Sequence, residues 1–232
     1  MQLDSNTMRA IIQQLIVLIL SIAVHEFGHA FVADRLGDRL PRSQGRVTLN
    51  PIAHADPIGT LALPAIFLLM SGGTSMGFGW GRPVQVNPLS FSRRFTMRTG
   101  HMMVAAAGPA MNILFGTAIA LLIFVLIKSG VLTGATETQA ELLRALNGAV
   151  LTNFVLAFFN LIPFPPLDGG AVIEGLLPRS ALASYQRVAQ YGTYIIIALI
   201  MLPKLSIVFI APARMLHGLV MGALFGFPTV GS

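Results

Sequence analysis

The sequence of 232 residues contains no cysteine and few charged side chains. The lack of cysteine excludes a disulfide framework and leaves no thiolate that could bind a metal or act as a nucleophile. Only 10% of the residues are charged, against roughly 25% in soluble domains. By contrast, 54% are hydrophobic and the mean hydropathy is +0.74. These values predict an integral membrane protein in a lipid bilayer, with no room for a soluble domain.

The net charge of +6 comes mainly from arginines in short segments between apolar runs. Arginine in such segments usually reports the orientation of a membrane protein and its contacts with lipid headgroups. No aromatic and basic residues are interleaved in the manner of an RNA or DNA surface, so we expect no nucleic-acid partner. The sequence gives no indication of the oligomeric state.

Three apolar runs are long enough to cross roughly 30 Å of bilayer hydrocarbon. They lie at about 9–33, 102–127 and 146–162. The region 188–227 is also apolar, with breaks at Pro203 and Pro212, and is expected to hold two more spans. The fold class is therefore all-α and polytopic, with about five transmembrane helices and a range of four to six.

A shorter apolar segment, 57–73, is interrupted by a proline and is flanked by arginines on both sides. Four arginines lie between Arg35 and Arg46, and four lie between Arg82 and Arg98. The positive-inside rule places both groups in the cytosol, so 57–73 must enter and return, or lie against the other helices, without crossing the membrane. We therefore predict a re-entrant segment.

The following segment, Gly77 to Pro88, is rich in glycine and proline, with alternating valines at Val84 and Val86. This pattern predicts a turn and extended chain that is β-hairpin-like. An extended Val84-Gln85-Val86 strand could pair with an unwound peptide.

Two histidines and a glutamate occupy the first apolar run, in the sequence HEFGH: His25, Glu26 and His29. Residues i and i+4 share a helix face, about 6 Å apart at roughly 1.5 Å per residue, so both imidazoles can bind one tetrahedral zinc ion. Glu26 can then act as general base on a zinc-bound water. Gly28 is expected to leave room there for a substrate backbone. Ionisable groups within a span are usually functional, and a proton relay in a transporter is the alternative.

A catalytic zinc ion needs a third protein ligand and an open position. The candidates are His54, Asp56, His101, Asp168, Glu174 and His217. Asp168 is preferred because it follows the inward-running span 146–162, and the prolines of NLIPFPPLDGG can turn it toward the bundle interior. The alternative is that Asp168 only caps a short helix expected over Gly169–Leu177.

Two further residues are candidates for contacts near the reaction. Asn160 could hydrogen-bond an extended substrate backbone or, equally, another helix of the bundle. His54 could donate a hydrogen bond from outside the ligand set or stabilise the transition state, although a plain loop histidine is as good a reading. The small residues of AAAGPAMN, Ala105 to Asn112, indicate close helix packing.

Together, HEFGH in the first span, AGPAMN in a middle span and NLIPFPPLDGG closing a later one resemble the site-2 proteases, the intramembrane zinc metalloproteases. RVTLNPIAHADPIGT and GFGWGRPVQVNP are similar to the compact prokaryotic members, and neither a PDZ nor a CBS domain is present. A prenyl-protein type protease, which also uses HExxH, is disfavoured because its third ligand usually comes from another helix bearing histidine and glutamate.

The resemblance covers about 10–175 and implies a core of three spans that holds one Zn²⁺ ion within the membrane, near the cytosolic side. It implies a single metalloprotease domain over 1–232, with C-terminal helices at about 185–228. By motif, His25, His29 and Asp168 match the zinc ligands. Glu26 matches the catalytic base, and Asn160 matches a residue that engages substrate.

The activity implied by the resemblance is hydrolysis of peptide bonds within or near transmembrane segments of membrane-anchored proteins, in regulated intramembrane proteolysis. The expected location is a prokaryotic inner membrane. The alternative function is a proton- or metal-coupled transporter that uses the same His, Glu and Asp cluster.

Overall fold

The computed structural model describes residues 5–71, 79–202 and 204–226, which are all-helical with no strand among them. Four helices within this part of the chain are long and apolar enough to cross a membrane. They are α1 (Ser5–Leu36), α5 (Met97–Lys128), α6 (Glu137–Asn160) and α10 (Ile207–Phe225). The fold class predicted from composition, an all-α polytopic membrane protein with four to six spans, is confirmed.

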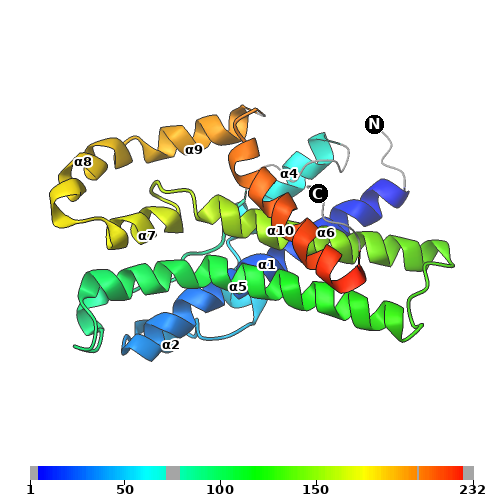
Figure 1. Cartoon of the computed structure of the whole chain (residues 1–232), viewed down its shortest axis with the longest axis horizontal. Helices are drawn as coiled ribbons and strands as arrows, with labels where there is room; N and C mark the ends of the chain where they lie inside the picture. The colour runs from blue at the N-terminus through cyan, green and yellow to red at the C-terminus, as the bar shows by residue number, and fades with distance from the viewer. Residues whose placement is uncertain (1–4, 72–78, 203, 227–232) are drawn as a thin grey trace.

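The helices α1, α5 and α6 pack against one another and form the centre of the molecule, and α10 covers α6 and α5 (Figure 1). The buried side chains between α5, α6 and α10 include Ile123, Val150, Phe154 and Ala213. Gly116 of α5 allows close approach, because a Cβ there would lie 2.7 Å from the Phe154 ring. Small residues at such crossings let membrane helices pack closely without a hydrophobic driving force.

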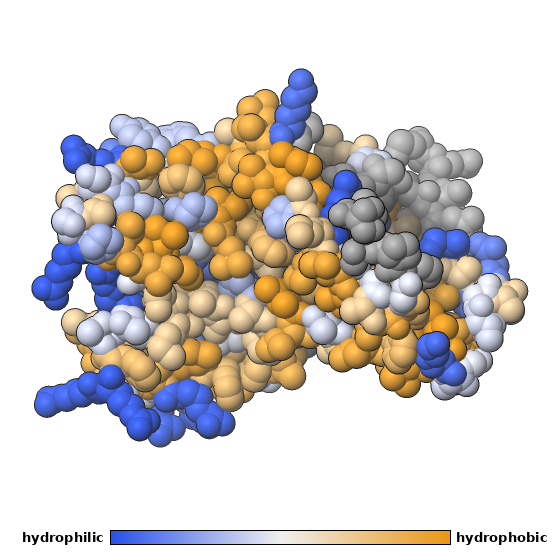
Figure 2. All heavy atoms as spheres, viewed as in Figure 1, coloured by the Kyte–Doolittle hydropathy of each residue, from blue (hydrophilic) through white to orange (hydrophobic). Residues whose placement is uncertain are grey.

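The outer surface of the bundle is apolar. Apolar side chains cover much of the face seen in Figure 2, and most of the hydrophilic ones gather toward its two ends. On α5, for example, Leu114, Leu121 and Val125 are exposed. An apolar outer surface suits contact with lipid acyl chains rather than water.

Between α1 and α5 the chain forms short elements, several of which contact α1. They are α2 (Leu40–Ser43), α3 (Pro51–His54), a π-helical turn η1 (Pro57–Ala62), α4 (Leu63–Met70) and a 3₁₀ turn η2 (Pro88–Ser90). The Ser92 N–H donates a hydrogen bond to the carbonyl of Leu36, at 2.7 Å. The start and the end of this connection therefore meet at the last residue of α1.

The predicted re-entrant segment is helical from Pro57 to Met70, which makes it shorter than the four candidate spans. The Asp56 carboxylate caps it by accepting hydrogen bonds from the N–H groups of Ile58 and Gly59. Pro64 is the second residue of α4 and follows the π-helical turn η1 directly, and the helix continues through it. The short length and the return of the chain to Leu36 both fit a segment that does not cross the membrane.

The segment that was expected to be hairpin-like is extended between Gly79 and Asn87 but pairs into no strand among the described residues. Its first two residues, at positions 77 and 78, lie outside them. Its backbone instead hydrogen-bonds to loops and side chains: Trp80 N–H to the Gly59 carbonyl at 3.1 Å, and Arg82 N–H to the His54 carbonyl at 2.8 Å. We call residues 79–87 the extended segment.

Two details of the helices differ from the sequence-based prediction: where α6 begins, and the effect of Pro212. The helix α6 begins at Glu137 rather than near 146, because the Thr136 side chain caps it by accepting from the Gln139 N–H. Pro212 lies inside α10 and does not break it, as neighbouring helices can compensate for a proline within a membrane bundle.

The C-terminal region also differs from the two spans that were expected. It holds α7 (Asp168–Leu176), α8 (Arg179–Ala189) and α9 (Gly192–Met201) before α10. The ten residues of α9 are too few to cross the bilayer, so α10 is the one candidate span after α6 in the described part of the chain. The helix α8 was not predicted.

Candidate metal centre

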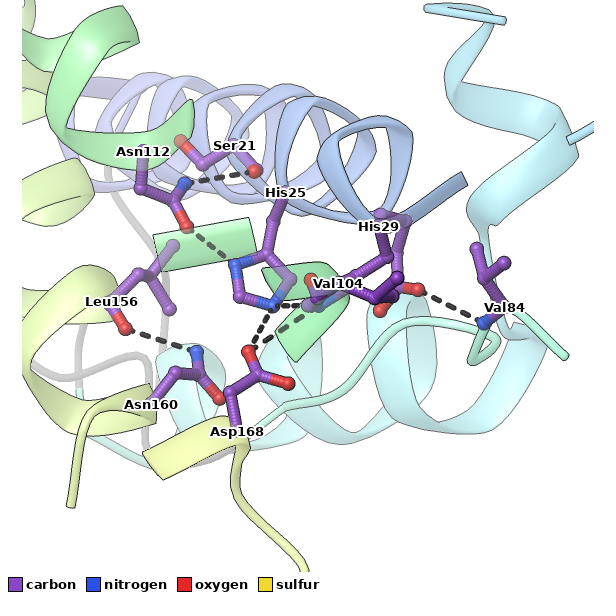
Figure 3. A network of polar contacts seen from close by, with 10 residues as sticks. Ser21, His25, His29, Val84, Val104, Asn112, Leu156, Asn160 and Asp168 are labelled. Atoms are coloured by element: carbon purple, nitrogen blue, oxygen red, sulfur yellow. Dashed lines mark hydrogen bonds and ion pairs between the residues drawn. The ribbon is translucent and has the colours of Figure 1, made fainter. Parts of the chain in front are cut away.

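The helix α1 presents His25 and His29 on one face, as the i, i+4 spacing requires. The two rings meet edge to face with centroids 4.7 Å apart, and their Nε2 atoms are 3.1 Å apart. Both residues are buried. The Nε2 atoms therefore converge on one point inside the bundle, visible at the centre of Figure 3.

Asp168 completes the cluster from a distant part of the chain. Its Oδ2 atom lies 3.1 Å from Nε2 of His25 and 3.3 Å from Nε2 of His29. The turn between α6 and α7, which contains three prolines, brings Asp168 next to the histidines of α1. Asp168 is the first residue of α7, and no side chain caps that helix, so the capping alternative for Asp168 is wrong.

These three side chains are suited to a cation. The Nδ1 atom of His29 faces the Val104 carbonyl at 2.7 Å, which can only accept, so the ring proton of the neutral imidazole lies on Nδ1. The Nδ1 atom of His25 faces Oδ1 of Asn112 at 2.7 Å and is protonated for the same reason. Two Nε2 lone pairs thus point at the carboxylate oxygen, which accepts no hydrogen bond although it is buried. Three convergent acceptors repel one another unless a cation, either a metal ion or a proton, lies between them.

Glu26 lies next to the cluster and is buried, with 9% of its surface exposed. Its Oε2 atom accepts a hydrogen bond from the Val84 N–H of the extended segment, at 3.1 Å. Gly81 approaches the same side chain closely, since a Cβ there would lie 3.4 Å from Oε1 of Glu26. The extended segment thus covers the glutamate of HEFGH on one side.

A cavity of about 1,120 Å³ opens onto these residues. It is bounded by α1, the extended segment, α5, α6, the proline turn before α7, and residues of α9 and α10. Asn160 lines this cavity and donates a hydrogen bond from Nδ2 to the Leu156 carbonyl, at 2.9 Å. Figure 3 shows Asn160 next to Asp168. The cavity has the size and the mixed apolar and polar lining that a bound ligand requires.

His54, the second candidate for a substrate contact, is not among the cavity-lining residues. Its side chain is fully buried at the end of α3, where Nε2 lies 2.8 Å from the Thr48 carbonyl. The structure therefore brings Asn160 to the cavity and leaves His54 in the packed loops behind the extended segment.

The sequence model of peptidase family M50 matches residues 13–203, which contain His25, Glu26, His29 and Asp168. The chain belongs to peptidase family M50. The resemblance to the site-2 proteases is thereby confirmed. The M50 peptidase is 36% identical over 188 residues to the Bacillus subtilis protein named "Putative zinc metalloprotease YwhC", covering 81% of this chain and 80% of that protein.

Two mycobacterial relatives share the description of zinc metalloprotease. Rip2 of Mycobacterium tuberculosis is 30% identical over 196 residues, and Rip2 of Mycolicibacterium smegmatis is 29% identical over 193 residues. Each alignment covers 81% of the M50 peptidase and 66% of the relative. No solved structure matches the chain. The names of the relatives and the donor set of two imidazoles and a carboxylate agree on zinc as the metal.

The glycine that makes room at the metal centre of the M50 peptidase is not the expected one. A Cβ on Gly28 would meet the Ala107 carbonyl at 2.7 Å and Met111 at 2.8 Å, so Gly28 serves the packing of α1 on α5 rather than substrate access. On Gly108 of α5, a Cβ would overlap the rings of both His25 and His29. Gly108 therefore leaves the space that the two imidazoles occupy.

Asn112 and Asn153 were not singled out as functional residues by the sequence. Both are fully buried, and Asn112 contacts His25 directly. The sequence did mark both residues as unusual, because each is a polar residue within an apolar span, where an amide without a hydrogen-bond partner is costly. That signal does not distinguish a helix-packing amide from one that supports a metal ligand.

Proposed function

We propose that this M50 peptidase hydrolyses peptide bonds within or near the transmembrane segments of membrane-anchored proteins. The observation that carries the proposal is the position of His25, Glu26 and His29 inside α1, a helix long enough to span the bilayer, with Asp168 of α7 brought against the two histidines. His29 lies seven residues before the end of α1, about 10 Å along the helix at roughly 1.5 Å per residue. A substrate must therefore come to this depth.

In this proposal His25, His29 and Asp168 hold one zinc ion, which when bound lowers the pKa of water and polarises a carbonyl group. Glu26 removes a proton from the attacking water and delivers it to the leaving amine. The Val84 N–H fixes the orientation of the Glu26 carboxylate, and the buried surroundings strengthen each of these electrostatic interactions.

The extended segment is proposed to bind the unwound substrate. The N–H groups of Trp80, Arg82 and Val84 already donate hydrogen bonds within the molecule. The N–H groups of Gly81 and Gln85 take part in no hydrogen bond in the described part of the chain. They alternate along the segment with the N–H groups that do. Alternate residues of an extended chain face opposite edges, so the edge of Gly81 and Gln85 can pair with a peptide as an added strand. Asn160, across the cavity, is a second proposed contact.

The proposed setting is the inner membrane of a prokaryotic cell, with the catalytic site near the cytosolic face. The arginine-rich connection between α1 and α5 supports this orientation by the positive-inside rule. In this arrangement cleavage would release a cytosolic product, as expected for regulated intramembrane proteolysis. We treat 1–232 as a single membrane-embedded catalytic domain.

Reconstitution with a membrane-anchored substrate tests the function. The wild type should cleave the substrate, whereas Glu26→Gln should bind zinc with similar stoichiometry and lose cleavage by several orders of magnitude. Glu174→Gln is the matched control, since Glu174 lines the edge of the same cavity and hydrogen-bonds Gln186. It should retain most activity. Cleavage by Glu26→Gln at the wild-type rate, or proton or metal flux that depends on the cluster without cleavage, would favour the transporter instead.

A further inference from the structure

A chain of buried amide hydrogen bonds joins the three central helices beside the metal centre. Asn112 of α5 and Asn153 of α6 are fully buried, and Nδ2 of Asn112 lies 3.0 Å from Oδ1 of Asn153. The same Nδ2 lies 3.1 Å from the Ser21 carbonyl of α1. Oδ1 of Asn112 faces His25 at 2.7 Å (Figure 3).

This chain has a fixed direction because both of its ends are backbone carbonyls, which can only accept. Asn153 donates from Nδ2 to the Ala149 carbonyl at 2.9 Å, so its Oδ1 must face Asn112. The NH₂ group of Asn112 then has two acceptors, Ser21 and Asn153, one for each hydrogen. Its Oδ1 is left for His25. The orientation of the Asn112 amide is therefore determined by groups that do not touch the metal centre.

The orientation of Asn112 decides which nitrogen of His25 carries the proton. With Oδ1 toward the ring, Nδ1 is protonated and the Nε2 lone pair points at Asp168. With the amide turned over, an NH₂ group would face Nδ1 and favour a proton on Nε2. A protonated Nε2 cannot bind a metal, and the partner of the second ring nitrogen commonly sets the tautomer of a histidine ligand.

We propose that Asn153 is a positioning residue for the metal centre: together with the Ser21 carbonyl, it holds the Asn112 amide in the orientation that keeps Nε2 of His25 free to bind zinc. The inference rests on His25 being a zinc ligand, as set out under the proposed function. Stability alone is a weaker reason for the pair, because a hydrogen bond between membrane helices contributes little to stability on average. The pair also links α6 to the metal centre at a point well before the turn that carries Asp168.

The test replaces Asn153 by leucine and measures zinc affinity by chelator competition in detergent. In the zinc-free protein labelled with ¹⁵N-histidine, the ring nitrogen shifts report the tautomer of His25, assigned by comparison with His25→Gln. Asn153→Leu should weaken zinc binding about tenfold, which is the lower end of the loss in metal affinity expected when the hydrogen-bond support of a metal ligand is removed. It should also populate the Nε2–H tautomer of His25. Asn147→Leu is the matched control. Asn147 also lies on α6 and pairs with another helix, through His217 at 2.9 Å, and its loss should change neither quantity.

A second variant separates the tautomer from simple packing. Asn112→Asp places a carboxylate opposite His25 that accepts in either orientation. The double variant Asn112→Asp, Asn153→Leu should therefore recover the Nδ1–H tautomer and zinc affinity to within a few-fold of the wild type. Asn153→Ala repeats the test without added bulk if the leucine variant does not fold.

Unchanged zinc affinity and tautomer in a folded Asn153→Leu or Asn153→Ala protein would overturn the proposal. So would failure of Asn112→Asp to rescue Asn153→Leu. Both readouts are independent of cleavage, so a failed protease assay would leave them interpretable. Loss of cleavage with normal zinc binding would contradict the proposed function alone.

Discussion

The backbone N–H of Val84 donates a hydrogen bond to the carboxylate of Glu26 at 3.1 Å, across 58 positions of sequence. This hydrogen bond joins the glutamate of HEFGH to the extended segment, which has no regular secondary structure. The extended segment is held at further points by Gly59, His54 and Asp38, the last accepting from the Asn87 N–H at 2.6 Å. The proposed general base and the proposed substrate-binding edge are therefore parts of one hydrogen-bonded unit.

Removing this single donor should lower activity without removing the metal. Val84→Pro lacks the N–H and should reduce kcat by about a hundredfold, since small errors in the position of a catalytic group have effects of that order. Val86→Pro is the control, because the Val86 N–H makes no hydrogen bond in the described part of the chain. Cleavage rates and zinc content are measured together. Equal losses in the two variants would show that stiffening of the segment, not the Glu26 contact, matters.

Gly108 should be intolerant of even one methyl group. In Gly108→Ala the Cβ would lie 2.7 Å from Cε1 of His25 and would overlap His29, so the rings must move. We expect zinc affinity to fall by about ten- to a hundredfold, measured by chelator competition. Gly148→Ala on α6 is the control, since a Cβ there meets nothing within 4 Å. Gly148→Ala should be neutral or stabilise the helix by up to about 1 kcal/mol.

The structure brings the three predicted ligands His25, His29 and Asp168 together, and short-range features of the sequence were enough to suggest them. The i, i+4 histidines and the aspartate after the prolines needed only helix geometry and a common depth in the membrane. The Asn112 and Asn153 pair could not be found in this way, since its meaning depends on which helices meet. The start of α6 was missed for a different reason: its first turns are polar, and only the capping Thr136 and the residues just after it mark the beginning of the helix.

Metal removal should loosen the contact between α1 and the turn that carries Asp168. A ligand that binds only the folded protein stabilises it by about 2.7 kcal/mol at a hundredfold excess over its Kd. Chelator should therefore lower the Tm of the wild type by several degrees, and added Zn²⁺ should restore it. In Asp168→Ala the shift should largely vanish, whereas Glu174→Gln should behave as the wild type. A full chelator shift in Asp168→Ala would remove Asp168 from the ligand set.

Arg46 should be required for the extended segment to keep its position. Its guanidinium is buried and donates to the carbonyls of Ala53 and Arg82. Burial and the neighbouring Arg82 lower the pKa of Arg46, but an arginine stays charged at neutral pH. Arg46→Met should cost about 2 to 3 kcal/mol in unfolding free energy by leaving carbonyls unpaired, and should reduce cleavage. Arg39→Met, at an exposed position in the same connection, should change stability by less than about 0.5 kcal/mol.

The hydrogen bond from Ser92 to the Leu36 carbonyl bears directly on topology. Because α1 ends where the chain returns to α5, the connection between them should begin and end on one side of the membrane. The absence of cysteine gives a clean background for accessibility labelling. A membrane-impermeant maleimide should label Arg39→Cys and Arg93→Cys from the same side, and Ala135→Cys, between α5 and α6, from the other. If Arg39→Cys and Arg93→Cys react from opposite sides, the helix from Pro57 to Met70 crosses the bilayer, and both the re-entrant prediction and the cytosolic position of the site must be abandoned.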